Sequence, residues 1–231
     1  MILQQYPDKH GGTSVPFFLF TNIIMPIPTT NATEELPAVN QILASVGQAP
    51  VTTLDQTNPD VAIAYDTLLQ VSKEVQAEGW TFNQEFEYEI TTDANKEYAI
   101  PNNILQIDFS DSYTGDIDVV RRSGKLYDRY NHTYALGDTA NTKYETDVVW
   151  FFDWVDLPQP VQNYIVSKAA TITAQRIVGD PQLIQTLQQR EALARANALE
   201  YECNQGDFSF FGHPQGQRYK TSYKPYNALQ R

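Results

Sequence analysis

The sequence predicts an α+β protein in which an antiparallel β-sheet or sandwich is inserted into a four-helix bundle. Apolar residues recur at spacings of three and four over residues 34–79 and again over 158–205, which is typical of amphipathic helices. Between them, over residues 80–157, the period changes to two, which is typical of half-buried strands. We therefore expect a helical part interrupted by a β part, with extended arms at 1–33 and 206–231.

Two helices are expected before the strands, and each is ended by a glycine. The first begins within residues 33–37 and ends at Gly47, a residue type that readily takes the left-handed conformation at a helix end. The second has Asn58 as its N-cap and Pro59 as its first helical residue, and it ends at Gly79. The start and the end of each helix are therefore predicted from residues that are close to them in the sequence.

Strict alternation marks the first expected strand, residues 85–90. It places apolar side chains on one face and carboxylates on the other. The apolar set is Phe86, Tyr88 and Ile90, and the acidic set is Glu85, Glu87 and Glu89. Further strands are expected at 104–110, 117–122, 125–130 and 146–154. The middle two flank a turn at Ser123-Gly124, so the strands form a small antiparallel sheet or sandwich.

A second pair of helices follows the strands with almost no loop between them. The earlier helix ends at Gly179, and Asp180 and Pro181 at once supply the N-cap and first residue of the next, which runs to Gly206. The earlier helix is apolar on two sides. Its main stripe is Val161, Ile165, Ala169 and Ile172, and its second stripe is Val166, Ala170, Thr173 and Ile177.

The composition is that of a folded globular protein with an acidic balance. Its 231 residues include 42% hydrophobic side chains, and 28 acidic against 16 basic residues give a formal charge of −12. That balance argues against wrapping of nucleic acid, because phosphate binding depends on Lys and Arg. The charge is uneven, since residues 80–157 carry −9 and residues 204–231 carry +3.

Nothing in the sequence predicts a secretion signal, membrane insertion or a disulfide framework. The most apolar early stretch, residues 15–28, contains three prolines and is too short to span a bilayer. Cys203 is the single cysteine, which excludes an internal disulfide and a multi-cysteine zinc site. We expect it to be a small core residue.

No catalytic, metal-binding or cofactor-binding site is predicted. The sequence lacks a glycine-rich phosphate loop, a Gly-x-Ser-x-Gly elbow and a His-Glu-x-x-His motif. The glutamate row of residues 85–90 could suggest the paired carboxylates of a glycoside hydrolase, but a solvated strand face is the preferred interpretation. Surface or loop positions are expected for the histidines His10, His132 and His213, the aspartates Asp108, Asp111, Asp116 and Asp118, and the cations Arg121, Arg122 and Lys125.

Several short runs stand in a fixed order between residues 34 and 207. They are Ala38-Val39-Asn40-Gln41-Ile42-Leu43, Gly47-Gln48-Ala49-Pro50-Val51, Lys73-Glu74-Val75-Gln76, Gly79-Trp80-Thr81-Phe82-Asn83, Gly124-Lys125-Leu126-Tyr127-Asp128-Arg129 and Val178-Gly179-Asp180. Together with the helix, sheet, helix plan, they resemble the tail tubular protein A family, the head-to-tail adaptors of short-tailed podophages. The resemblance leaves the first 24 residues outside it, so the start at Met1 or at Met25 stays open.

The resemblance implies a structural, non-enzymatic protein of the virion tail, assembled in the host cytoplasm as a ring of twelve copies. Its implied partners are the portal protein on one side and the nozzle, tail tubular protein B, on the other, with tail fibres attached near the nozzle junction. DNA would pass through the ring without specific binding, and an acidic wall would serve that passage because it offers phosphates no cations. The copy number and the surface that faces the channel are not fixed by the residues themselves.

Two sets of residues are candidates for the contacts of such a ring. The second stripe of the helix before Gly179 is the candidate subunit interface: Val166, Ala170, Thr173 and Ile177. The aromatic and basic C-terminal segment is the candidate for docking on the portal: Phe208, Phe210, Phe211, Arg218, Tyr219, Lys220, Tyr223, Lys224, Tyr226 and Arg231. Two alternatives stay open, namely a carbohydrate-cleaving tail component that uses the glutamate row, and a monomeric ligand-binding module.

Overall fold

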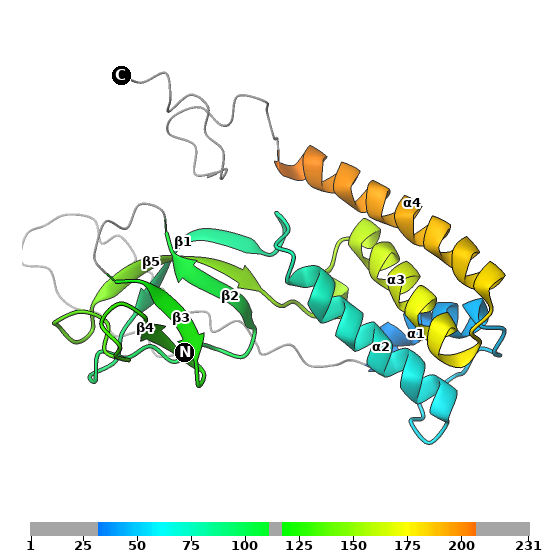
Figure 1. Cartoon of the computed structure of the whole chain (residues 1–231), viewed down its shortest axis with the longest axis horizontal. Helices are drawn as coiled ribbons and strands as arrows, with labels where there is room; N and C mark the ends of the chain where they lie inside the picture. The colour runs from blue at the N-terminus through cyan, green and yellow to red at the C-terminus, as the bar shows by residue number, and fades with distance from the viewer. Residues whose placement is uncertain (1–31, 111–116, 207–231) are drawn as a thin grey trace, which may run out of the picture.

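A computed structural model describes residues 32–110 and 117–206 and confirms the predicted α+β class. Four α-helices and five strands follow in the order helix, helix, strands, helix, helix within these ranges. The helices lie side by side at one end, and the strands form two small sheets at the other (Figure 1). The predicted arms fall almost wholly outside the described residues.

The helices begin and end close to the predicted signals. They are α1 Ala32–Ser45, α2 Pro59–Gln76, α3 Gln159–Ile177 and α4 Pro181–Gly206. Asn58 caps α2, because its side-chain oxygen accepts a hydrogen bond from the Asp60 N–H at 3.1 Å. At the turn between α3 and α4, Gly179 has a φ of +69° and Asp180 Oδ1 accepts from the Gln182 N–H at 3.1 Å.

Several boundaries differ from the predicted ones, and two of these differences change the assignment of individual residues. α1 starts at Ala32, before the predicted window, so Pro37 lies inside the helix, where it cannot donate a backbone hydrogen bond. The last strand ends at Trp150 rather than at Trp154, and Trp154 begins the short 3₁₀ helix η1, Trp154–Asp156. The aromatic residues after the strand pack as part of the core instead, as described below.

α3 is the centre of the helical part. It packs against α1, α2 and α4, whereas α4 packs chiefly against α3. The core that these helices share includes Ile42, Leu68 and Ile165, each with 0% of its surface exposed. The predicted four-helix bundle is therefore a three-helix core of α1, α2 and α3, with α4 added to the outer side of α3 (Figure 1).

The strands form two layers. They are β1 Gln84–Thr91, β2 Ile104–Phe109, β3 Val119–Arg122, β4 Lys125–Asp128 and β5 Lys143–Trp150. One layer is an antiparallel sheet in the order β1-β5-β2, and the other is the two-stranded ribbon β3-β4. Leu126 and Val119 of the ribbon meet Val148 of the sheet in a second core, so the β part is a small sandwich.

The two cores meet at Phe152, whose side chain packs against both. Asn83 lies at the same junction, and its side-chain N–H groups donate to the carbonyl oxygens of Gln76 and Trp150, both at 2.8 Å. Its side-chain oxygen accepts from the Trp80 N–H, also at 2.8 Å. These buried polar contacts fix the orientation of the sheet relative to α2, because each group would otherwise lack a partner.

Candidate functional site

A β-bulge in β1 overturns the predicted row of glutamates. The register shifts between Glu85 and Tyr88, and Glu87 in between has a φ of +57°. Glu85 is paired with Val148, which belongs to the core, so Glu85 lies on the inner side of the sheet. Glu89 lies on the opposite side, paired with Glu145. The three glutamates therefore do not share one face, and the strict alternation expected over residues 85–90 is interrupted.

The outer face of the sheet carries carboxylates from all three strands. Glu89 lies directly opposite Glu145, and Asp108 lies directly opposite Asp147. The side chains of the alternate residues of β5 are buried, which assigns Glu145 and Asp147 to the face away from the core. Lys143 forms an ion pair with Glu89 at 2.6 Å. This face, which we call the acidic face, is defined by Glu89, Asp108, Glu145 and Asp147.

The pKa of the Asp108 carboxyl group is changed by burial and by the charges near it on the acidic face. Burial raises its pKa, and the hydrogen bond from the Phe109 N–H partly offsets that increase. The neighbouring carboxylates of Asp118 and Asp147 raise the pKa further, and the Arg129 guanidinium lowers it. Like charges that face each other across strands are destabilising, so this arrangement costs stability in the isolated subunit.

The outer face of the β3-β4 ribbon has the opposite chemistry. Val120 is paired with Tyr127 and Arg122 with Lys125, on the side of the ribbon away from the core. The Arg122 guanidinium lies 4.1 Å from the centre of the Tyr127 ring, and Tyr127 meets Tyr134 edge to face at 4.9 Å. We call this surface the Arg–Tyr face and define it by Val120, Arg122, Lys125, Tyr127 and Tyr134.

Sequence reasoning missed the Arg–Tyr face, although a signal was present. The cations Arg121, Arg122 and Lys125 are predicted to be scattered charges at a hairpin, and two of them do have oxygen partners of their own. Arg121 donates to the Ile104 carbonyl at 2.7 Å, and Lys125 forms an ion pair with Glu97. Alternation along the ribbon would have placed Arg122 and Tyr127 on one face, but only the structure brings Tyr134 to them.

The predicted subunit-interface residues of α3 lie mostly inside the subunit. Val166, Ala170 and Thr173 are buried, with 8%, 5% and 0% of their surfaces exposed, while Ile177 is half-buried. α3 is apolar on two sides because it is surrounded by α1, α2 and α4. A neighbouring copy could not reach the three buried residues in this conformation, so only Ile177 stays available for an interface.

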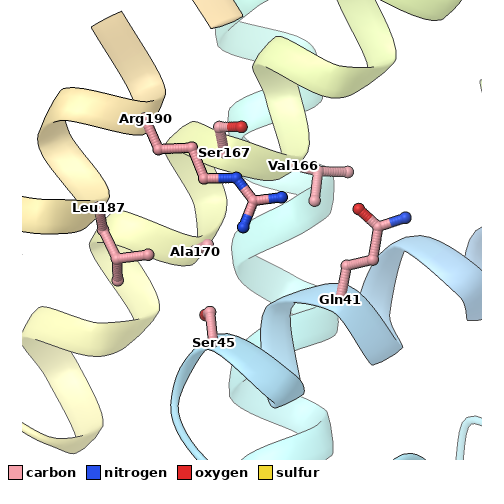
Figure 2. A pocket seen from close by; sticks show the side chains of 7 residues that line it. All are labelled: Gln41, Ser45, Val166, Ser167, Ala170, Leu187 and Arg190. Atoms are coloured by element: carbon pink, nitrogen blue, oxygen red, sulfur yellow. The ribbon is translucent and has the colours of Figure 1, made fainter. Parts of the chain in front are cut away.

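A small hollow lies between α1, α3 and α4, and Arg190 extends into it (Figure 2). Its volume is about 20 Å³, which is room for about one water molecule. It is lined by Gln41, Ser45, Val166, Ser167, Ala170, Leu187 and Arg190. This space is too small for a cofactor or a substrate.

The outward side of α4 is open and largely uncharged. Leu193 is 64% exposed and Leu199 is 45% exposed, and Ala192 and Ala196 beside them are exposed too. Cys203 follows on the same side and is also exposed, so the prediction that it is a core residue is wrong. The reason is that the buried stripe of α4 runs through Leu187 and Ala198, roughly opposite on the helix.

Catalytic chemistry finds little support among the described residues. No group of three or more His, Cys, Asp or Glu side chains within residues 32–110 and 117–206 is placed to hold a metal ion. His132 is an exposed residue in a left-handed turn, whereas His10, His213, Asp111 and Asp116 lie outside the described residues. The predicted portal-docking residues, from Phe208 to Arg231, lie outside them as well. No described helix is long and apolar enough to cross a membrane.

Comparison with known proteins assigns the chain to a family. The sequence profile of a family described as Tube, tail tubular protein, matches residues 36–208, which is most of the chain. The match includes α3, α4 and all five described strands. No curated protein matches the chain.

Proposed function

Because the chain belongs to the tail tubular protein family, it is a structural protein of a phage tail, and we propose that it forms a closed ring between the portal and the tail nozzle. The observation that carries this proposal is the family match, which extends over both the helical part and the β part. In the proposed assembly twelve copies surround a channel for DNA. The portal binds on one side, the nozzle protein binds on the other, and the tail fibres attach near the nozzle.

The open surfaces of the subunit support a ring. A subunit of a closed ring must present two different faces to its two neighbours as well as faces to its axial partners. The outward side of α4, with Leu193 and Leu199, is one such surface, and the half-buried Ile177 at the end of α3 is a further apolar residue that a neighbour could reach. We therefore propose that the helical part, residues 34–79 and 158–205, builds the ring through α4 rather than through the buried stripe of α3.

The charge of the chain suits a passage for DNA. A formal charge of −12 per copy would give a ring of such subunits a strongly negative field. Phosphates would find few cations to displace their counterions, so the duplex would pass without being held. The proposed function therefore includes a channel that guides DNA but does not bind it specifically.

No specific observation among the described residues favours either alternative function. A carbohydrate-cleaving component would need two carboxyl groups aimed at one bond, but the bulge at Glu87 separates Glu85 from Glu89. A ligand-binding module would need a pocket, and the hollow that the described residues form beside Arg190 holds about one water molecule. We therefore keep the structural ring as the proposed function.

The proposal can be tested with the full chain and the portal of the same phage. We expect native mass spectrometry and negative-stain electron microscopy to show closed rings, either of the chain alone or once portal is added. A chain that stays monomeric at all concentrations and does not bind portal would contradict the proposed function.

A further inference from the structure

The acidic face and the Arg–Tyr face lie on opposite sides of the β part. The inner side of the sheet and the inner side of the ribbon contribute to one core, through Val148 and Leu126 among others. Their outer sides must therefore point away from each other (Figure 1). Each copy of the chain thus offers one strongly acidic surface and, on the other side, one cationic and aromatic surface.

Both faces carry charges that a partner of opposite charge would stabilise further. On the acidic face, Asp108 opposes Asp147 and Glu89 opposes Glu145. Lys143 pairs with Glu89 and Arg129 acts on Asp108, and a further cation from a partner would offset more of the repulsion among the four carboxylates. On the other face, Arg122 is exposed and forms no ion pair with any described residue. Stacking on Tyr127 holds the Arg122 guanidinium in place, which lowers the entropy cost of a contact.

The geometry points to a head-to-tail contact between β parts, in which the Arg–Tyr face of one copy docks on the acidic face of the next copy. This inference rests on the proposed ring, because a contact between two different faces of identical subunits propagates and closes into a ring. A second copy is the occupant that charge complementarity selects, since the chain itself supplies both surfaces. Arginine and tyrosine are also the residue types enriched at the centres of protein interfaces.

Charge reversal tests the contact in the full chain. Arg122→Glu and Asp108→Arg should each weaken self-association roughly tenfold or more, because each places like charges across the interface. The double variant, with both reversals in one chain, should recover most of the association, since the two faces are again complementary. Lys73→Glu and Asp156→Arg are matched controls, because they change the net charge equally at exposed positions outside both faces.

A cross-linking experiment identifies the two faces directly. In a Cys203→Ser background, one preparation carries Arg122→Cys and another carries Glu145→Cys. A short bismaleimide should link the two preparations when they are mixed, and it should link neither preparation to itself. This pattern would support a contact between different faces and needs no change in the strength of assembly.

The outcomes separate this inference from the proposed function. A wild-type ring that tolerates both reversals, or that gives no mixed cross-link, contradicts the β contact and leaves the ring standing. Reversal variants that lose association but do not recover it in the double variant also contradict the contact if circular dichroism shows them folded. A wild-type chain that never assembles, even with portal, contradicts the ring and this contact together.

Discussion

The side-chain amide of Gln76 forms two hydrogen bonds with the backbone of Phe152. Its Nε2 donates to the Phe152 carbonyl at 3.1 Å, and its Oε1 accepts from the Phe152 N–H at 2.8 Å. Gln76 is fully buried at the end of α2, and Phe152 follows β5. The amide therefore takes the place that the backbone of a neighbouring strand would occupy, and it joins the helical part to the β part.

We predict that Gln76→Leu lowers the free energy of unfolding by about 2–4 kcal/mol, because it leaves both Phe152 groups without a partner at a buried junction. Chemical denaturation of the full chain measures this loss. Gln175→Leu, at an exposed position of α3, is the control and should change stability little. Equal effects of the two substitutions would show that the junction does not depend on this amide.

Local features of this fold could be read from the sequence, and long-range ones could not. The N-caps at Asn58 and Asp180 and the turn at Gly179 depend on neighbouring residues, and the structure confirms all three. The bond between Gln76 and Phe152 joins residues far apart in the chain. The bulge at Glu87 cannot be predicted from the alternating pattern of residues 85–90, because the pattern does not show whether one strand contains an extra residue.

The candidate surfaces, too, could be predicted from the sequence only in part. The sequence shows that α3 is apolar on two sides, but not which element covers each side. In the structure α4 and α1 cover Val166 and Ala170, and the open surface is the outward side of α4 with Leu193. The spacing of apolar residues therefore identifies a buried surface without telling an internal contact from a contact between subunits.

The helical core allows a graded test of packing. We predict that Ile165→Asp costs more than about 4 kcal/mol and leaves no folded protein, because it buries an unpaired charge at a position with no exposed surface. Ile172→Asp should cost less, because Ile172 is only partly buried against the same core. Circular dichroism and yield of the purified chain measure both. A normally folded Ile165→Asp variant would contradict the assignment of α3 to the centre.

The carboxyl group of Glu35 predicts a dependence of stability on pH. Glu35 is 4% exposed, and burial raises its pKa above the usual value despite a hydrogen bond with Tyr65. A raised pKa means that the folded state favours the neutral acid, so the stability from this group is present at low pH and is lost as the pH rises through the folded-state pKa.

Glu35→Gln should therefore raise the thermal midpoint at pH 7 by roughly 2–4 °C, as about 1 kcal/mol would in a chain of this size. The gain should disappear below about pH 4, where the carboxyl is protonated in both states. Asp66→Asn, at an exposed position of α2, is the control and should show no such trend. A gain that persists at low pH would mean that the amide acts through its contacts rather than through the missing charge.

The glutamates of β1 should have no hydrolytic role. We predict that Glu85→Gln, Glu87→Gln and Glu89→Gln together leave any polysaccharide turnover of the preparation unchanged, since the bulge separates these side chains. Release of reducing ends from host surface polysaccharide is the measurement. Turnover that is present in wild type and absent from the triple variant would favour the carbohydrate-cleaving alternative.

The last prediction concerns residues 207–231, which we propose to dock on the portal. This segment combines the aromatic and basic residues from Phe208 to Arg231 and has a net charge of +3, although the whole chain carries −12. Such side chains supply the rigid anchors and cations that dominate protein contacts. A chain cut after Gly206 keeps the whole of α4, and it keeps the hydrogen bond at 2.8 Å from the Thr81 N–H to Glu202 that holds the end of α4 against the start of the β part.

The truncated chain should therefore fold with an unchanged thermal midpoint and lose most of its affinity for portal, as measured by biolayer interferometry on immobilised portal. A full-length variant with Arg218, Lys220 and Lys224 replaced by alanine separates the two contributions, because it keeps the aromatic anchors and removes cations. Its affinity should fall between those of wild type and the truncated chain. Unchanged portal binding by the truncated chain, or loss of its fold, would instead assign this segment to its own subunit or to the adjacent one, and the portal contact would then have to lie on α3 and α4.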